Sequence, residues 1–285
     1  MVVVLVCASE SDRAGSEKSD RAGSEKSDRA GSENSLSDRV ARLLARIDCR
    51  RADSGEEREP VLRLRYQAYL REGAIPPNST GTFSDPYDET PNAYLFGLYI
   101  DDQLASSIRI HVGSSERPNF PSLEVFPDIL QPELDADKVI IDPTRFVADE
   151  TLSRLHRGLP YATLRLSMVA AEHFGADLVL AAVREEHQAF YRRAFNQRLI
   201  GEARPYPHLS KPISLMAVHY PSVVDKLWQR YPFIPSTLAE RRKLFERPQH
   251  ASDRSNHELS SSQEPSASRE SNRPFAELAA ARVAS

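Results

Sequence analysis

The sequence predicts a single mixed α/β domain, an α/β (α+β) fold whose mixed central sheet is flanked by helices. Two observations support this fold class. Amphipathic helical stretches alternate with short runs of β-branched and aromatic residues between positions 56 and 220. The apolar fraction, 40%, and the charged fraction, 27%, are those of a chain that can bury a core. We therefore expect the folded domain at 56–220, a helix and linker at 36–55, and a helical extension at 221–247.

The two ends of the chain lack the pattern of folded segments. Residues 11–34 repeat the octad SDRAGSEK, which offers no large apolar side chain, and such a composition cannot offset the entropy lost on ordering. The other end is rich in Ser, Glu, Asn and Arg, apart from a weak helical pattern at 275–283. We predict disordered tails at 1–35 and 248–285. The apolar start lacks the basic region of a signal peptide.

Composition also argues against several classes of protein. A formal net charge of −4 does not suit a general nucleic-acid binder. The two cysteines, Cys7 and Cys49, form neither a disulfide framework nor a zinc pattern and fit a reducing compartment. No apolar run reaches the roughly 18–20 residues of a membrane helix. The histidines form no metal-binding pair. We expect a cytoplasmic protein with no integral membrane segment, no nucleic-acid partner and no metal site.

Periodicity predicts the first helices and the loop that follows them. Apolar residues recur at helical spacing in 36–48 and 56–72, and Gly73 stands where a helix commonly ends. The polar, proline-rich stretch 74–91 is long for a structureless connection, and long ordered loops are usually functional.

A hairpin and a third strand come next. Runs of β-branched and aromatic residues at 93–100 and 104–112 are separated by a short acidic turn, which predicts an antiparallel hairpin. The proline-punctuated stretch 113–137 suggests no regular element. A strand is expected at 139–147.

Helices and strands alternate in the second half of the domain. A polar loop at 151–159 precedes Pro160, which suits the first turn of a helix. The continuous apolar run that follows this helix is typical of a strand covered on both faces. The stretch 221–245 is helical in pattern and basic. The expected elements are helices at 161–174 and 185–195 and strands at 176–183 and 213–219.

The strand at 139–147 carries two charges, Asp142 and Arg145, where a buried strand would be apolar. An edge strand facing water explains them, and so does a strand on the floor of an active site. Being three residues apart, they would point to opposite faces of a flat strand, so a bulge or twist near Pro143 would be needed to bring them together. Arg109 similarly interrupts an apolar alternation in the preceding strand.

Four motifs lie in order along these elements. They are Arg65-Tyr66-Gln67-Ala68-Tyr69 on the first domain helix, Asp85-Pro86-Tyr87-Asp88 in the loop, Arg109 on a strand, and Asp142-Pro143-Thr144-Arg145-Phe146 on the next strand. Together they resemble the GNAT-fold N-acyltransferases, in the branch of N-acyl amino acid synthases and acyl-homoserine-lactone (autoinducer) synthases. The resemblance runs from Arg65 to about Tyr220. It implies the GNAT acyl-CoA N-acyltransferase fold for 56–220.

Departures from the family motifs bear on the substrates. Gly73-Ala74-Ile75 stands where autoinducer synthases have Gly-Trp, and Asp142 replaces their glutamate; both changes favour the amino acid synthases. The pyrophosphate-binding loop of CoA-dependent relatives survives only in part at 153–160. The resemblance then implies no tightly bound cofactor and a donor presented as acyl-phosphopantetheine on acyl carrier protein, with acyl-CoA as the alternative. Candidate contacts for this acidic partner are Arg154, His156, Arg157, Arg192, Arg193 and Arg198.

The predicted reaction moves a long-chain acyl group to the α-amine of an amino acid, whose ammonium must first lose a proton. Asp142 is the first candidate for the base and Asp88 the second. Tyr191 is either the acid for the leaving thiolate or a packed aromatic. Backbone N–H groups around Phe146 and Val147 would stabilise the oxyanion.

The other candidate residues would bind substrate. Arg145 or Arg109 could hold the acceptor's carboxylate, and Tyr69 and Phe126 could border the acyl pocket. Arg65, Asp85, Asp88 and Arg109 would bind substrate or form an ion-pair network that orders the loop. The alternative functions are an acyl-homoserine-lactone synthase, a CoA-dependent acetyltransferase of the same fold, and a non-catalytic acyl-binding module.

Overall fold

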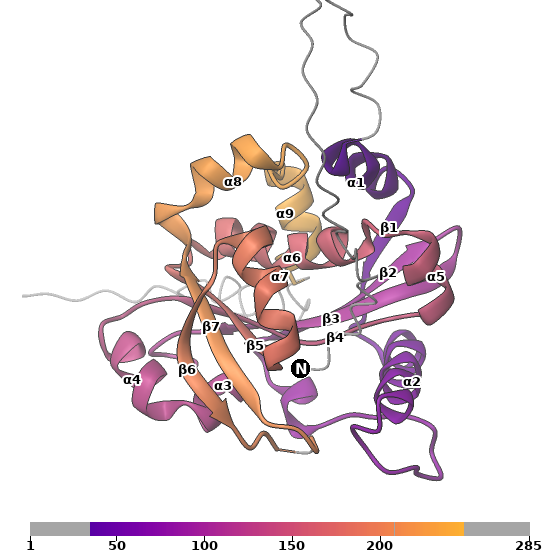
Figure 1. Ribbon diagram of the computed structural model, residues 1–285, viewed down its shortest axis with the longest axis horizontal. Coiled ribbons are helices and arrows are strands. Elements are labelled where there is room, and N and C mark those ends of the chain that lie inside the picture. The colour runs from indigo at the N-terminus through magenta and orange to yellow at the C-terminus, as the bar shows by residue number, and fades with distance from the viewer. Residues whose placement is uncertain (1–34, 208, 248–285) are drawn as a thin grey trace, which may run out of the picture. The chain divides into compact units, whose positions relative to one another are not determined.

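The computed structural model describes residues 35–207 and 209–247 (Figure 1). The predictions made for 1–34 and 248–285 lie outside the described residues. In chain order the elements are α1 (Leu36–Leu44), β1 (Ile47–Arg51), α2 (Gly55–Arg71), the 3₁₀ turn η2 (Pro86–Glu89), β2 (Ala93–Ile100), β3 (Gln103–Gly113), α3 (Pro121–Val125), α4 (Pro127–Asp135), β4 (Ile140–Ala148), α5 (Glu150–Leu155), α6 (Leu159–Phe174), β5 (Leu178–Val183), α7 (Glu185–Phe195), β6 (Arg198–Arg204), β7 (Ile213–His219), the 3₁₀ turn η3 (Tyr220–Ser222), α8 (Val224–Arg230) and α9 (Leu238–Phe245).

The strands of the described residues form one mixed sheet in the order β1-β2-β3-β4-β5-β7-β6. Only β4 and β5 pair in parallel, while the other neighbours are antiparallel. This confirms the predicted mixed sheet, and the predicted hairpin is β2–β3. The parallel pairing is short, joining Ile140 to Leu178 and Ile141 to Val179. Beyond it, β4 continues beside β3 and β5 continues beside β7, so the two central strands part.

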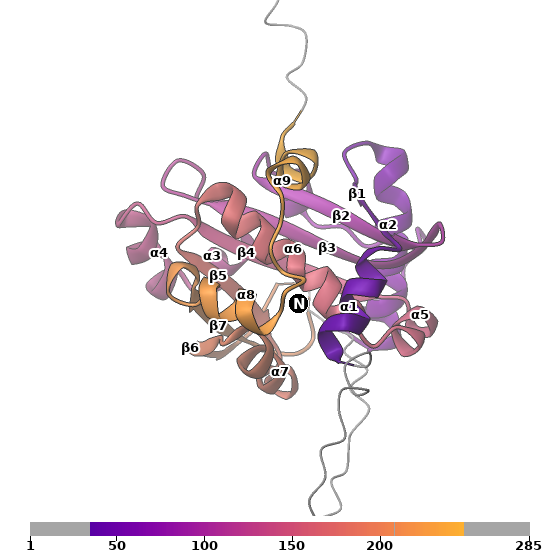
Figure 2. The same cartoon turned by 90° about the horizontal axis from the view of Figure 1, so that it is seen from above.

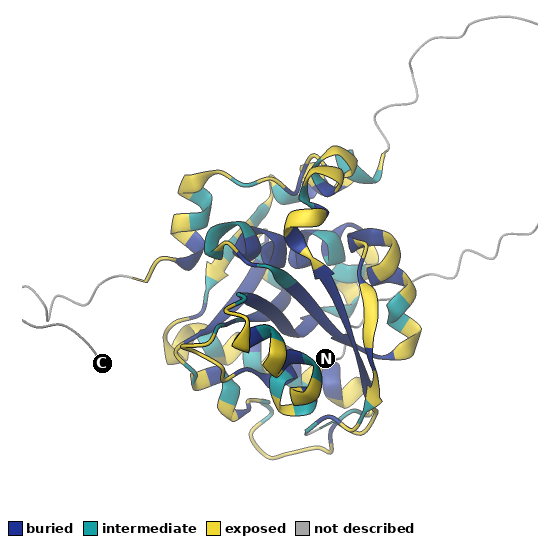
Figure 3. Ribbon diagram, turned by 90° about the vertical axis from the view of Figure 1, so that its left-hand side faces the viewer, coloured by how far each residue is buried: buried dark blue, intermediate teal, exposed yellow. Residues whose placement is uncertain are grey.

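Helices cover both faces of the sheet, as Figures 1 and 2 show. On one face α6 packs against β3, β4 and β5, and α1 and α9 pack on α6. On the other face α2 packs against β3 and β4, and α3 contacts β4. The central strands are dark blue in Figure 3 and the outward faces of the helices yellow. The core therefore lies between the sheet and its two helical layers.

The buried elements match the predictions closely. Helix α6 begins one residue before Pro160 and ends before Gly175, whose φ of 62° is the left-handed conformation that glycine adopts freely. Gly73, with a φ of 61°, follows α2 in the same conformation. β2, α7 and β7 have the predicted limits.

Two edge strands differ from the predictions. Residues 47–51 were expected to end a helix and begin a linker, yet α1 ends at Leu44 and β1 pairs with β2. The strand was missed because only alternate residues of β1 are half-buried and because Ile47 also fits the helical spacing of the preceding apolar residues. β6 was not predicted, because all but two of its residues are exposed. An edge strand with a solvated face lacks the apolar run that marks a central strand.

Segments predicted to be irregular contain short helices. α3 and α4 lie within 113–137, and α5 overlaps the first half of the expected loop 151–159. Pro121 and Pro127 occupy first helical positions, where the missing N–H of proline would have no helical partner anyway. Asp149 caps α5, its side chain accepting from the Leu152 N–H at 2.9 Å. The prolines therefore begin helices rather than break them.

The extension at 221–247 consists of two short helices, and α9 is fastened to the domain. Arg165 of α6 donates to Glu240 at 2.5 and 2.9 Å and to the Phe233 carbonyl at 2.6 Å. This guanidinium therefore fixes α9 against α6. Within 35–207 and 209–247, every helix is too short or too polar to cross a membrane.

Candidate active site

Five charged side chains form a buried network on the α2 face of the sheet, each less than a tenth exposed. Asp88 of η2 accepts from Arg65 of α2 at 2.8 and 3.2 Å, and from Arg109 of β3 at 2.8 Å. Asp85, which precedes η2, accepts from Arg109 at 2.6 Å. It also accepts from Nε of Arg145, on β4, at 2.8 Å. The network thus joins one helix, two strands and the loop.

The network keeps both of its carboxyl groups ionised. Burial by itself would raise their pKa values, but the neighbouring guanidinium groups hold the pKa of Asp85 and the pKa of Asp88 below the ordinary value. Both oxygens of Asp88 are engaged, since its Oδ2 also accepts from the Asp85 N–H at 3.0 Å. The network that the sequence offered as an alternative is therefore present, and it orders the loop around η2.

Arg145 lies at a β-bulge in β4. Ser107 of β3 is opposite Val147 and Arg109 is opposite Thr144, so β4 contains one residue more than β3 over this stretch. Arg145 has a φ of 54°, which is uncommon for a residue with a side chain. Such strained positions cluster at functional sites. The bulge is two or three residues beyond the predicted position at Pro143, and it directs Arg145 to Asp85.

Asp142 does not pair with Arg145. It is fully buried, and it accepts from the backbone N–H of Ser122 at 3.0 Å and from the Ser122 hydroxyl at 2.8 Å. Burial raises the pKa of Asp142, and these two hydrogen bonds oppose that effect only in part. The expectation that a bulge would bring Asp142 and Arg145 together is wrong, because Asp142 instead fixes the beginning of α3.

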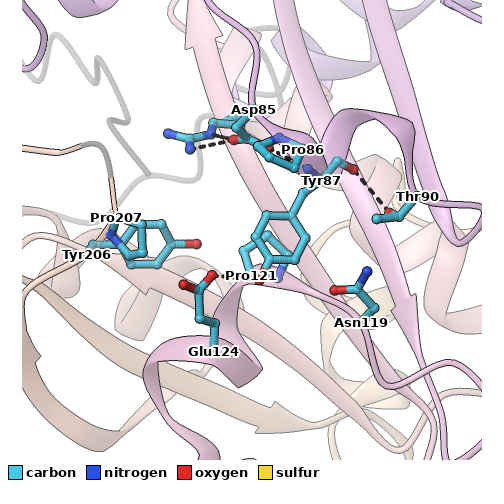
Figure 4. A pocket seen from close by; sticks show the side chains of 10 residues that line it. Asp85, Pro86, Tyr87, Thr90, Asn119, Pro121, Glu124, Tyr206 and Pro207 are labelled. Carbon is cyan, nitrogen blue, oxygen red and sulfur yellow. Dashed lines mark hydrogen bonds and ion pairs between the residues drawn. The ribbon is translucent and has the colours of Figure 1, made fainter.

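A cavity of about 360 Å³ lies beside the network (Figure 4). Its walls include Asp85 and Tyr87 from the loop, Glu124 from α3, Arg145 from β4, and Tyr206 after β6. Arg145 is 3% exposed, and its Nη1 has no hydrogen-bond partner among the described residues. Arg145 is therefore a cation at the cavity that has one buried donor unsatisfied.

The other predicted residues are divided among three environments. Phe126 packs in the core beneath α3 and α4, and Phe146 packs in the main core. Val147 contacts the cluster under α2 that includes Tyr69. The guanidinium carbon of Arg145 lies 5.7 Å from the centre of the Tyr69 ring. Of these four side chains, none is among those that line the cavity.

Tyr191 lies apart from the cavity, in an aromatic cluster of α7. Its ring centre is 5.3 Å from that of Phe190 and 6.4 Å from that of Phe195. Its hydroxyl is buried without a partner among the described residues, and burial raises the pKa of Tyr191 well above its ordinary value. The surroundings of Tyr191 are those of a packed aromatic side chain. Its role as the acid for the leaving thiolate stays a prediction.

Three residues near the cavity escaped the sequence analysis: Ser122, Glu124 and Tyr206. The first two lie in the proline-punctuated stretch for which no element was predicted. Tyr206 follows an edge strand that was also missed. Pro121, directly before Ser122, is the local signal that a helix begins there.

A second, larger groove of about 630 Å³ is lined by basic side chains. The end of α5 and the turn after it contribute Arg154, His156 and Arg157, and α1 supplies residues of the facing wall. Leu155, the last residue of α5, is 69% exposed. Three of the six predicted carrier-protein contacts thus share one groove. The arginines on the facing side are Arg39 and Arg42 of α1 and Arg46, which follows it. Arg192, Arg193 and Arg198 are not part of its lining.

Comparison with solved structures identifies the fold. FeeM, an N-acyl amino acid synthase from uncultured soil microbes, superposes with a TM-score of 0.53 at 20% identity, covering 65% of this chain and 94% of that chain. BjaI, a CoA-dependent acyl-homoserine lactone synthase, gives 0.48 at 16% identity, covering 67% and 90%. An acyl-CoA N-acyltransferase from Pseudomonas aeruginosa gives 0.41 at 19% identity, covering 60% and 97%. The fold is that of the GNAT acyltransferases.

The family follows from the sequence itself. The family model for the N-acyl amino acid synthase FeeM matches residues 60–219, which is more than half of the chain. The protein therefore belongs to the FeeM N-acyl amino acid synthase family and is an N-acyltransferase. A comparison with curated proteins finds no match.

Proposed function

We propose that the protein transfers a long-chain acyl group from acyl carrier protein to the α-amine of an amino acid. The observation that carries this proposal is Arg145, which lines the cavity and whose buried Nη1 has no hydrogen-bond partner among the described residues. A buried donor left without a partner costs free energy. The α-carboxylate of an amino acid would satisfy it with a charge-assisted hydrogen bond. An acceptor held in this way places its amine in the same cavity.

The parting of β4 and β5 supports an adjacent site for the thioester. Past Ile141 the backbone of β4 has no ladder with β5. An acyl thioester inserted between the strands would meet the backbone of Phe146 and Val147, whose N–H groups could stabilise the oxyanion of the tetrahedral intermediate. This geometry does not require a cofactor. The amine nitrogen attacks the carbonyl carbon, the new C–N bond forms and the C–S bond breaks.

The leaving thiolate takes up a proton when the thioester is cleaved. Tyr191 is our candidate for donating it, because its hydroxyl is buried and unpartnered among the described residues. A thiolate is a good leaving group and does not need a strong acid. We therefore expect Tyr191 to contribute modestly to the rate.

The basic groove between α1 and the α5–α6 turn supports a carrier protein as the partner. An acidic protein surface is attracted by a groove lined with arginines, and such attraction mainly increases the association rate. The exposed Leu155 adds an apolar contact. Acyl-CoA is the alternative donor, since its phosphates would be attracted by the same charges.

Product analysis with defined donors tests the proposal. The purified protein is incubated with dodecanoyl- or hexadecanoyl-acyl carrier protein and a mixture of amino acids, and the products are separated by mass spectrometry. We expect an N-acyl amino acid, and we expect Arg145→Lys to raise the KM for the amino acid because lysine cannot span Asp85 and a carboxylate together. Turnover of acetyl-CoA alone, with no N-acyl amino acid, would refute the proposal. A lactone formed from S-adenosylmethionine would identify an autoinducer synthase instead.

A further inference from the structure

We infer that Glu124 of α3, oriented by Tyr87, binds the ammonium group of the acceptor and takes a proton from it. This inference rests on the proposed function, because it concerns the amine that is acylated. It gives a catalytic role to a residue that lies outside all four sequence motifs. It also makes the cavity a site for a zwitterion, with Arg145 as the cationic contact and Glu124 as the anionic one.

The other carboxylates near the site are already engaged. Asp85 lines the cavity, but its oxygens accept from two arginines, which keep its pKa far below the ordinary value despite its burial. Both oxygens of Asp88 are bonded within the network. Both oxygens of Asp142 are bonded to Ser122, and Asp142 does not line the cavity. Glu124 is the carboxylate that remains among the described cavity residues.

Glu124 is held in place through one oxygen only. Its Oε2 accepts from the Tyr87 hydroxyl at 2.6 Å, while the hydrogen bonds of the described residues leave Oε1 unengaged. Tyr87 is itself fixed, since its N–H donates to Asp85 at 3.0 Å and its ring lies edge-on to that of His111 with centres 5.8 Å apart. Burial, followed by the bond to Glu124, raises the pKa of Tyr87, so this phenol stays a neutral donor. The buried network thus sets the position of Glu124 through Tyr87.

The position of Glu124 suits both binding and proton removal. Figure 4 shows its carboxylate near the rings of Tyr87 and Tyr206, on the side of the cavity away from Asp85. An amino acid whose carboxylate contacts Arg145 can direct its ammonium across the cavity to Glu124. Glu124 is exposed, whereas Arg145 is buried. A proton accepted there can therefore be returned to water.

The proton balance of the acylation is complete with this group. One N–H proton of the ammonium passes to Oε1 of Glu124 and then to solvent, which leaves a neutral amine with a lone pair. The amine attacks the thioester carbonyl carbon, and the C–S bond breaks as the amide forms. The second proton lost from nitrogen balances the one taken up by the leaving thiolate. The third proton remains on the amide nitrogen.

The charged and titratable groups around Glu124 come from several elements. The loop supplies Asp85 and Tyr87, β4 supplies Arg145, and the segment after β6 supplies Tyr206. Arg204 of β6 also approaches α3, donating to the Val125 carbonyl at 3.1 Å. Of these, Asp85 is held ionised and both tyrosines have raised pKa values through burial first. A change in rate near neutral pH is therefore attributed to the substrate amine.

The pH dependence of a Glu124→Gln variant provides the decisive measurement. At neutral pH we expect kcat/KM for the amino acid to fall by about 10²- to 10⁴-fold, the usual range for loss of a general base. The deficit should shrink as the pH approaches the pKa of the substrate ammonium, because solvent then supplies the neutral amine. Glu116→Gln, which removes an exposed carboxyl outside the cavity, serves as the control and should match the wild type.

Two further variants keep the inference open to refutation. Tyr87→Phe leaves Glu124 in place but removes its hydrogen bond, so the loss should be smaller and show the same pH rescue. Glu124→Asp keeps the carboxylate and substitutes for Glu124→Gln should that variant fail to fold. Wild-type kcat/KM in Glu124→Gln, or a deficit independent of pH, would overturn the inference while the wild type still makes product. Absence of product from the wild type would instead reject the proposed function.

Discussion

Replacing Asp85 with asparagine tests the buried network, because the change removes one charge and little volume. Asp85 is the ionic partner that Arg145 has among the described residues, and it shares Arg109 with Asp88. The new amide nitrogen would face guanidinium donors. Breaking a buried pair by removing one partner costs about 3–5 kcal/mol. Domains commonly have about 5–15 kcal/mol of stability in total, so this loss would be a large share.

Urea denaturation measures this effect, with the free energy of unfolding obtained by linear extrapolation. The control is Glu89→Gln, which removes a carboxyl from the same η2 turn. Glu89 bonds Arg58 at 2.7 Å, but its side chain is 75% exposed. Exposed pairs contribute about 0–1 kcal/mol, so this variant should remain close to the wild type. If Asp85→Asn proved as stable as Glu89→Gln, the network would not be what orders the loop.

The same network determines how stability depends on pH. The folded-state pKa values of Asp85 and Asp88 lie below their ordinary value of 3.8. The unfolded chain therefore binds more protons than the native one in acid, and stability rises with pH in that range. The full contribution is present above 3.8 and is lost as the pH falls below it. Asp85→Asn should lose less stability on acidification than the wild type, which equilibrium unfolding at several pH values would reveal.

Three further outcomes are expected. Gly113→Ala would bring a Cβ into overlap with the Phe120 ring, and such overpacking should lower the free energy of unfolding by about 1–3 kcal/mol in urea titrations. Tyr191→Phe removes a hydroxyl without a described partner, so thermal unfolding should be unchanged, while a fall in kcat would support its role as the acid. Arg157→Glu should raise the KM for acyl carrier protein in a salt-dependent manner, whereas Arg192→Glu, outside the groove, should not.

The buried elements could be predicted from the sequence because their apolar residues recur at the spacing of a helix or a strand. The strands at 93–100 and 213–219 and the helix at 185–195 have the limits expected of them. The edge strands β1 and β6 face solvent on one side, so their residues carry little apolar alternation. Short helices begun by proline were equally hidden, because five residues are fewer than two helical turns.

The charged residues of the site could be identified, but their partners could not. Asp142 and Arg145 are three residues apart in one strand, so they could meet only through a bulge or twist. One extra residue in β4 sends Arg145 to Asp85 instead, and Asp142 meets Ser122. A bulge depends on the register of the facing strand, which no single stretch of sequence encodes. Glu124 had no signal at all, since an exposed glutamate on a short helix resembles any surface residue.

The count of charges links the network to the proposed acceptor. Arg65, Arg109 and Arg145 face Asp85 and Asp88, so three cations share two anions. Arg145 reaches Asp85 through Nε and Nη2, which leaves Nη1 directed elsewhere. Under the proposed function, an amino acid brings the missing anion as its α-carboxylate, and a simple amine does not. Selectivity for amino acids over other amines then follows from a charge imbalance within the fold, since only a carboxylate neutralises the third guanidinium.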